Sequence, residues 1–153
     1  MRMFVAIAIT VVLGIGSRPG FALGASDKPP DPLLIAALEA RLRQAAPRDQ
    51  CYLYAELLQQ LTELSLQRYA AGNVEEASAL LQRVQQTAGN LHQALAQRGK
   101  RLKNTEILLR RAAFRLTEML HSSSYEDRPL VEQTLSLVTR AQTATMMQVF
   151  RNN

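Results

Sequence analysis

QRGKRLKNTEILLRRAAFR, residues 97–115, decides both how many helices the chain forms and where its charge lies. A helical pattern of apolar residues begins near Val74, continues through this stretch and ends near His121. If the helix continues through Gly99, residues 74–121 form one rod of about 70 Å. If the chain turns at Gly99, two shorter helices can pack side by side. Because Arg98 followed by glycine is a common helix stop, we expect a turn or kink there and keep the continuous helix as the alternative.

The same stretch carries seven basic residues and one acidic residue, Glu106. On a helical wheel its basic side chains lie opposite the apolar stripe, and Ile107 and Phe114 lie among them, seven residues apart. These two form either a second buried stripe beneath a neighbouring helix or an exposed apolar strip in a basic frame. The apolar stripe is Leu102, Leu109, Ala113, Leu116 and Leu120, with Thr105 as a weak position, and the candidate binding residues are Lys100, Arg101, Lys103, Ile107, Arg110, Arg111, Phe114 and Arg115.

The remainder of residues 33–151 predicts a single all-α domain. Leu, Ala, Gln, Glu and Arg dominate, and runs of β-branched residues are missing. Asp31 is a good N-cap for a first helix, and Gly72 ends a second helix, after which Asn73 caps the third. Short polar turns between these helices predict a small antiparallel bundle of four to five helices. The expected helices are 32–46, 49–71, the segment from 74 to 121 as one helix or two, and 127–150.

One hairpin in this bundle has a family resemblance. The stretch RYAAGNVEEASALLQRV, residues 68–84, resembles the middle of a tetratricopeptide repeat, with Leu64, Gly72 and Ala77 at the positions of its leucine, glycine and alanine. The resemblance covers about residues 58–90 in a single copy and lacks the closing proline of that repeat. It implies a helical scaffold that binds peptides or proteins.

The chain begins with the layout of a secretory signal peptide. Residues 3–16 are uncharged and mostly apolar, and a run of 14 is too short to span a bilayer, which needs about 20 apolar residues. Small residues then predict cleavage after Ala22, with Ala25 as the alternative. Residues 1–22 are therefore a predicted signal peptide, and 23–32 a polar, proline-rich linker. We expect an exported protein, periplasmic or secreted, without a transmembrane segment in the mature chain.

The residues that could carry chemistry are few. Glu118 and His121 have the Glu-x-x-His spacing of metal-binding helix bundles, but the motif stands alone, so we expect no metal, no cofactor and a helix-end role for His121. The serines 122–124 lack the glycine elbow of a nucleophile. The single cysteine, Cys51, excludes an internal disulfide, and it is either a buried apolar residue or a site that pairs with another chain.

Taken together, these features predict an exported, non-catalytic helical protein that acts as an interaction or scaffold module. Its partner is expected to be a protein, with an acidic helix or an anionic envelope surface as the two kinds of target that residues 98–115 would suit. Nucleic acid is disfavoured because the chain is exported and has no recognised nucleic-acid-binding fold. A metal- or cofactor-carrying bundle is the alternative from another class, and the oligomeric state stays open.

Overall fold

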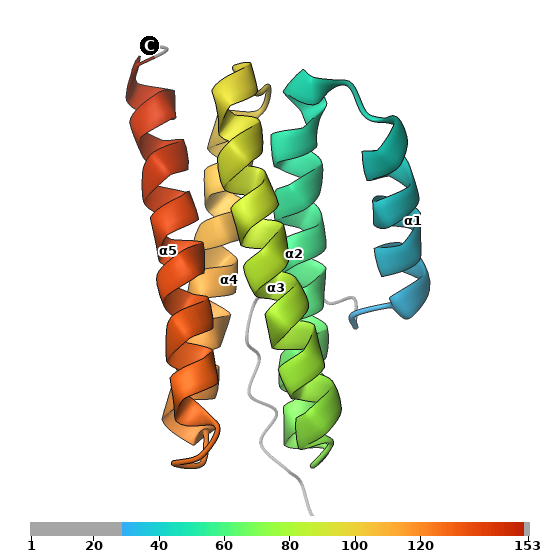
Figure 1. Ribbon diagram of the computed structural model, residues 1–153, viewed down its shortest axis with the longest axis vertical. Coiled ribbons are helices and arrows are strands. Elements are labelled where there is room, and N and C mark those ends of the chain that lie inside the picture. Colours follow the sequence, from blue (N-terminus) through green and yellow to red (C-terminus); the bar gives the residue numbers. More distant parts are fainter. Residues whose placement is uncertain (1–28, 152–153) are drawn as a thin grey trace, which may run out of the picture.

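Five α-helices and one short 3₁₀ helix make up the protein in a computed structural model that describes residues 29–151 (Figure 1). The all-α prediction is confirmed, and no strand occurs within this range. The predicted signal peptide, its cleavage after Ala22 or Ala25, and linker residues 23–28 lie outside the described residues. None of the helices between residues 29 and 151 has the length and apolar character needed to cross a membrane. The elements are α1 Pro32–Gln44, α2 Pro47–Ala70, α3 Val74–Ala94, η1 Leu95–Gln97, α4 Leu102–Ser122 and α5 Arg128–Arg151.

The helices form two antiparallel hairpins that stack side by side. One hairpin is α2–α3 and the other is α4–α5, and α1 packs on the outside of α2 (Figure 1). The hairpins meet with α2 beside α4 and α3 beside α5, and the helices in each of these two pairs run in the same direction. The predicted antiparallel packing therefore holds within each hairpin, whereas the contact between hairpins is parallel. This arrangement requires the chain to cross the end of the bundle between α3 and α4.

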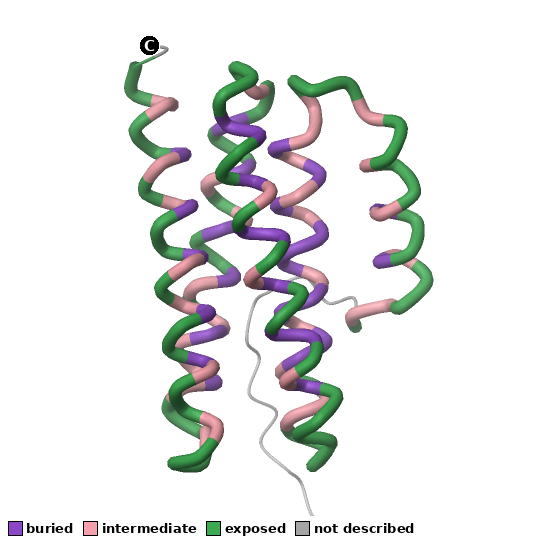
Figure 2. Tube along the Cα trace, viewed as in Figure 1, coloured by how far each residue is buried: buried purple, intermediate pink, exposed green. Residues whose placement is uncertain are grey.

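The core lies between the four long helices, where their buried faces meet (Figure 2). In α3 the predicted stripe is confirmed in full, because every position of the four-and-three spacing is buried. In α2 the buried surface extends around more of the helix, since α2 contacts α1, α3 and α4. The buried stripe of α3 and η1 is Ala77, Leu81, Val84, Ala88, Leu91 and Leu95.

The buried face of α4 is rotated from the predicted one. Thr105, the weak position in the sequence pattern, is completely buried, and its hydroxyl donates to the carbonyl oxygen of Arg101 at 3.2 Å. Ala112 and Met119 are also buried, whereas Ala113 and Leu120 are only half-buried. The helical wheel underestimated Thr105 because a threonine whose hydroxyl is hydrogen-bonded within its own helix can fill a core position.

Two of the predicted helix ends are confirmed and one is wrong. The side chain of Asp31 accepts a hydrogen bond from the Leu33 amide at 2.8 Å, and Gly72 has the left-handed conformation with φ 84°. Asn73 makes no side-chain bond to the start of α3. Glu76, three residues further on, lies 3.1 Å from the guanidinium of Arg68.

The crossover between α3 and α4 confirms the predicted turn at Gly99, although the glycine serves another purpose than expected. Left-handed backbone conformations fall on Arg98 (φ 52°) and Arg101 (φ 58°) rather than on the glycine. Gly99 is needed because its backbone presses on α2: a Cβ atom there would lie 3.0 Å from the sulfur of Cys51. The Lys100 amide next to it donates to the carbonyl oxygen of Arg48 at 2.7 Å. The turn is thus fixed to the start of α2 by packing and by a backbone hydrogen bond.

We predict that Gly99→Ala destabilises the protein by about 1–3 kcal/mol, because the new methyl group overpacks the contact with Cys51. The matched control is Gly89→Ala on the exposed face of α3, where nothing lies within 4 Å of the added carbon. That change should stabilise the fold by up to about 1 kcal/mol through helix propensity. Urea unfolding measures the free energy of unfolding of both variants. Equal values for Gly99→Ala and Gly89→Ala would contradict the close contact between Gly99 and Cys51.

Candidate interaction surface

The outer face of α4 carries two exposed apolar side chains. Ile107 is 37% exposed and Phe114 is 60% exposed, so of the two readings of the sequence the exposed strip is the one observed. Lys103, Arg110 and Arg111 are exposed on the same face. Positions 103, 107, 110 and 114 follow one another at steps of four and three, which places them in one line along the helix. Arg111 lies one turn after Ile107 on the same face. We call Lys103, Ile107, Arg110, Arg111 and Phe114 the α4 strip.

The predicted basic residues differ in how far they are engaged by the rest of the protein. The guanidinium of Arg101 lies over the ring of Tyr52, 3.5 Å from its centroid, and the Lys100 ammonium is 3.9 Å from Asp49. Arg110 is 3.8 Å from Glu106 one turn earlier. Lys103 and Arg111 have no ion-pair partner within the described part of the chain, so they carry the least compensated charge of the strip.

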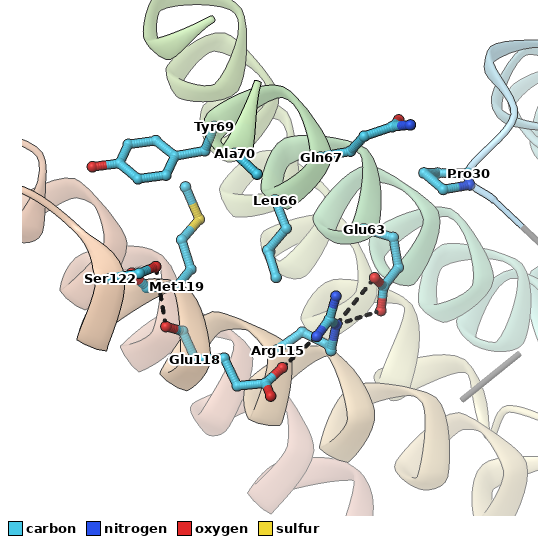
Figure 3. A pocket seen from close by; sticks show the side chains of 10 residues that line it. All are labelled: Pro30, Glu63, Leu66, Gln67, Tyr69, Ala70, Arg115, Glu118, Met119 and Ser122. Carbon is cyan, nitrogen blue, oxygen red and sulfur yellow. Dashed lines mark hydrogen bonds and ion pairs between the residues drawn. The ribbon is translucent and has the colours of Figure 1, made fainter. Parts of the chain in front are cut away.

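Arg115 stands apart from the other predicted binding residues. Its Nε lies 3.1 Å from both carboxylate oxygens of Glu63 on α2, and its guanidinium also donates to Glu118 (Figure 3). Burial acts to lower the pKa of Arg115, but the charge of Glu63 and the bonds to both carboxylates outweigh it and raise that pKa. Arg115 therefore ties α4 to α2 and does not belong to the α4 strip.

A cavity of about 610 Å³ lies beside this ion pair, between α2 and α4 (Figure 3). Its middle is apolar, with Leu66 and Met119, and Tyr69 lines its far end. The hydroxyl of Tyr69 is occupied, because it donates to Asp127 at 3.1 Å and accepts from the Ser124 amide at 2.9 Å. Beside the cavity, Arg115 thus bonds to Glu63 and Glu118, and the hydroxyl of Tyr69 is likewise engaged in hydrogen bonds.

The predicted metal pair does not assemble into a larger site. Glu118 is engaged by Arg115, and His121 is exposed at the end of α4. Among residues 29–151 no group of three or more His, Cys, Asp or Glu side chains is placed to hold a metal ion. The serine hydroxyls nearby bond within the helix end: Ser122 and Ser123 both donate to the carbonyl oxygen of Met119.

Basic and acidic residues are concentrated in opposite halves of the bundle. This separation is not evident from their order in the sequence. The half of the bundle where α2 and α4 begin consists of residues 39–58, 83–111 and 140–151, and we call it the basic half (Figure 1). It contains twelve of the fifteen Lys and Arg residues of the described chain and four of its twelve Asp and Glu residues. The other half, the acidic half, has three basic and eight acidic residues. The formal charges are therefore +8 and −5.

Ion pairing leaves these net charges unchanged and determines which side chains carry them. All four acidic residues of the basic half are ion-paired, so its uncompensated charge is entirely positive. In the acidic half, Glu75, Glu126 and Glu132 have no ion-pair partner within residues 29–151. The pairs of the basic half are Glu39–Arg83, Asp49–Lys100, Glu56–Arg41 and Glu106–Arg110.

Sequence reasoning found the basic stretch 98–115 but missed the residues that join it in space. Arg43 lies in the last turn of α1, Arg48 in the first turn of α2 and Arg151 at the end of α5, and all three are at the same end of the bundle as the 98–101 turn (Figure 1). No local signal in the sequence could reveal this, because these residues are separated by up to 108 positions and reach the same end of the bundle only through the helix directions.

Comparisons of the chain with protein-family models, with curated proteins and with solved structures return no match.

Cys51 is buried, as one of the two readings of the sequence predicted, and burial raises its pKa to about 11 from 9.0. We predict that the native thiol does not react with a maleimide or a disulfide reagent at pH 8 until the protein unfolds. Stability should also fall as the pH rises from 9 to 11, because the unfolded thiol ionises first. Cys51→Ala should lack this loss of stability between pH 9 and 11. Rapid labelling of the native protein would contradict the burial of Cys51.

Proposed function

We propose that the protein is an exported, non-catalytic interaction module that binds an acidic amphipathic helix of a partner protein along the α4 strip. The observation that carries the proposal is the exposure of Ile107 and Phe114 between uncompensated cations. A large aromatic side chain in water is costly unless another surface covers it, and aromatic residues with arginine neighbours are typical of the centres of protein interfaces.

The spacing of the strip favours a helix as the ligand. Ile107 and Phe114 are seven residues apart, about 10.5 Å along the helix axis. A partner helix that lies nearly parallel to α4 can place two apolar residues at the same spacing against them, as in a coiled-coil contact. Carboxylates on either side of that apolar pair would then lie opposite Lys103, Arg110 and Arg111, which gives the binding a preferred register.

The non-catalytic role and the export each have a separate basis. The hydroxyls and carboxylates nearest the cavity between α2 and α4 are engaged in structural bonds, such as that between Arg115 and Glu63, which favours a binding role over catalysis. Export rests on the sequence of residues 1–22 alone.

Photo-cross-linking in the native host tests this proposal directly. Benzoylphenylalanine at position 114 should capture a defined partner through an acidic helical segment, because the probe replaces the central aromatic residue of the strip. The matched control is position 125, where Tyr125 is 93% exposed in the turn before α5. The same products from both positions, or none from position 114, would contradict the proposal.

The captured partner then permits a quantitative test. Phe114→Ala should weaken its binding at least tenfold, since aromatic anchors at interfaces contribute about 2 kcal/mol or more. Tyr125→Ala should bind with unchanged affinity, and both variants should melt as the unchanged protein does, because neither side chain is buried. An unchanged affinity for Phe114→Ala would place the partner on another surface.

A further inference from the structure

A second surface lies at the end of the basic half, separate from the α4 strip. It is formed by the last turn of α1, the first turn of α2, the 98–101 turn and the last turns of α5 (Figure 1). We propose that this end of the bundle docks on an anionic lipid surface, with the bundle axis steeply inclined to the membrane. The proposal is independent of the partner helix proposed for α4.

This end of the bundle carries positive charge that no ion pair of the described residues compensates. Arg43, Arg98 and Arg151 are exposed and have no ion-pair partner among residues 29–151. The acidic residues closest in sequence to the starts of α2 and α4, Asp49 and Glu106, pair with Lys100 and Arg110 at 3.9 and 3.8 Å, distances at which the attraction in water is weak. Because each basic side chain near an anionic leaflet adds to the attraction, several of them on one end produce stable binding.

Exposed apolar side chains lie next to one of these cations, Arg151, at the end of α5. Phe150 is 72% exposed and Met147 is 61% exposed, and both lie in the last two turns of α5. Apolar side chains flanked by Arg are the composition of interfacial anchors, whose rings and methyl groups enter the boundary between headgroups and acyl chains. A duplex nucleic acid, which is bound mainly through its phosphates, would gain little from Phe150 and Met147, so these two residues favour a lipid surface over such a polyanion.

The acidic half lies at the opposite end of the molecule and orients it. Its formal charge of −5 is repelled by an anionic surface while the basic half is attracted. The molecule is therefore oriented before contact, with the ends of α1 and α5 toward the bilayer. In this orientation Ile107 and Phe114, on the side of the bundle, stay accessible to a partner.

Binding to vesicles tests the proposal. The full chain is mixed with vesicles of phosphatidylcholine alone and with vesicles that also contain phosphatidylglycerol, and the bound fraction is measured by flotation. Residues 3–16 are apolar and are flanked by Arg2 and Arg18, so the readout is the ratio of binding to anionic and neutral vesicles, compared between the unchanged chain and its variants. We expect a ratio well above one that falls as salt is added.

Variants locate the contact. Arg43→Gln with Arg151→Gln should lower the anionic preference about 25-fold, at about fivefold for each cation lost. Phe150→Ser should lower binding to anionic vesicles as well. The matched control is Arg128→Gln in the acidic half, which removes one exposed cation and should leave the ratio unchanged.

Three outcomes would overturn the proposal. They are equal binding to neutral and anionic vesicles, a loss with Arg128→Gln as large as that for the Arg43 and Arg151 changes, and tighter binding to heparin than to vesicles with no effect of Phe150→Ser. Phe114→Ala should bind vesicles normally, so failure of the lipid test leaves the partner-helix test unaffected.

Discussion

The contact between the backbone of Gly99 and the side chain of Cys51 determines how the two hairpins meet. It holds the crossover after α3 against the first turn of α2, and the amide of Lys100 bonds to Arg48 at the same place. Because α4 starts there, it runs beside α2 and in the same direction (Figure 1). The cost is two arginines in left-handed conformations, Arg98 and Arg101, which the surrounding contacts must maintain.

Both candidate surfaces depend on this topology. Parallel alignment of α2 with α4, and of α3 with α5, brings the basic starts of two helices to the same end as the basic ends of α1 and α5. The same packing buries the Thr105 side of α4 and turns Ile107 and Phe114 to solvent. One surface thus lies at the end of the bundle and the other on its side, so both could be occupied at once.

The sequence predicted the local features well and the long-range ones poorly. The α3 stripe, the turn at Gly99 and the left-handed Gly72 follow from periodicity and glycine chemistry, and each is confirmed. Periodicity could not show which neighbours a helix meets, so the buried Thr105 was underestimated and the partner of Arg115 was missed. The gathering of charge at one end was invisible for the same reason, because it depends on helix direction rather than on local sequence.

The most direct test of this account is whether α2 lies beside α4 in solution. Cysteines placed at Gln67 and Ser122, which line the same cavity between these helices, can be joined with a short bismaleimide, and the buried Cys51 leaves the background unreactive. The account predicts efficient intramolecular cross-linking of this pair and none between cysteines at Gln67 and Gln133, since α2 and α5 lie diagonally across the bundle. Cross-linking of Gln67 with Gln133 and not with Ser122 would contradict the topology on which both surfaces rest.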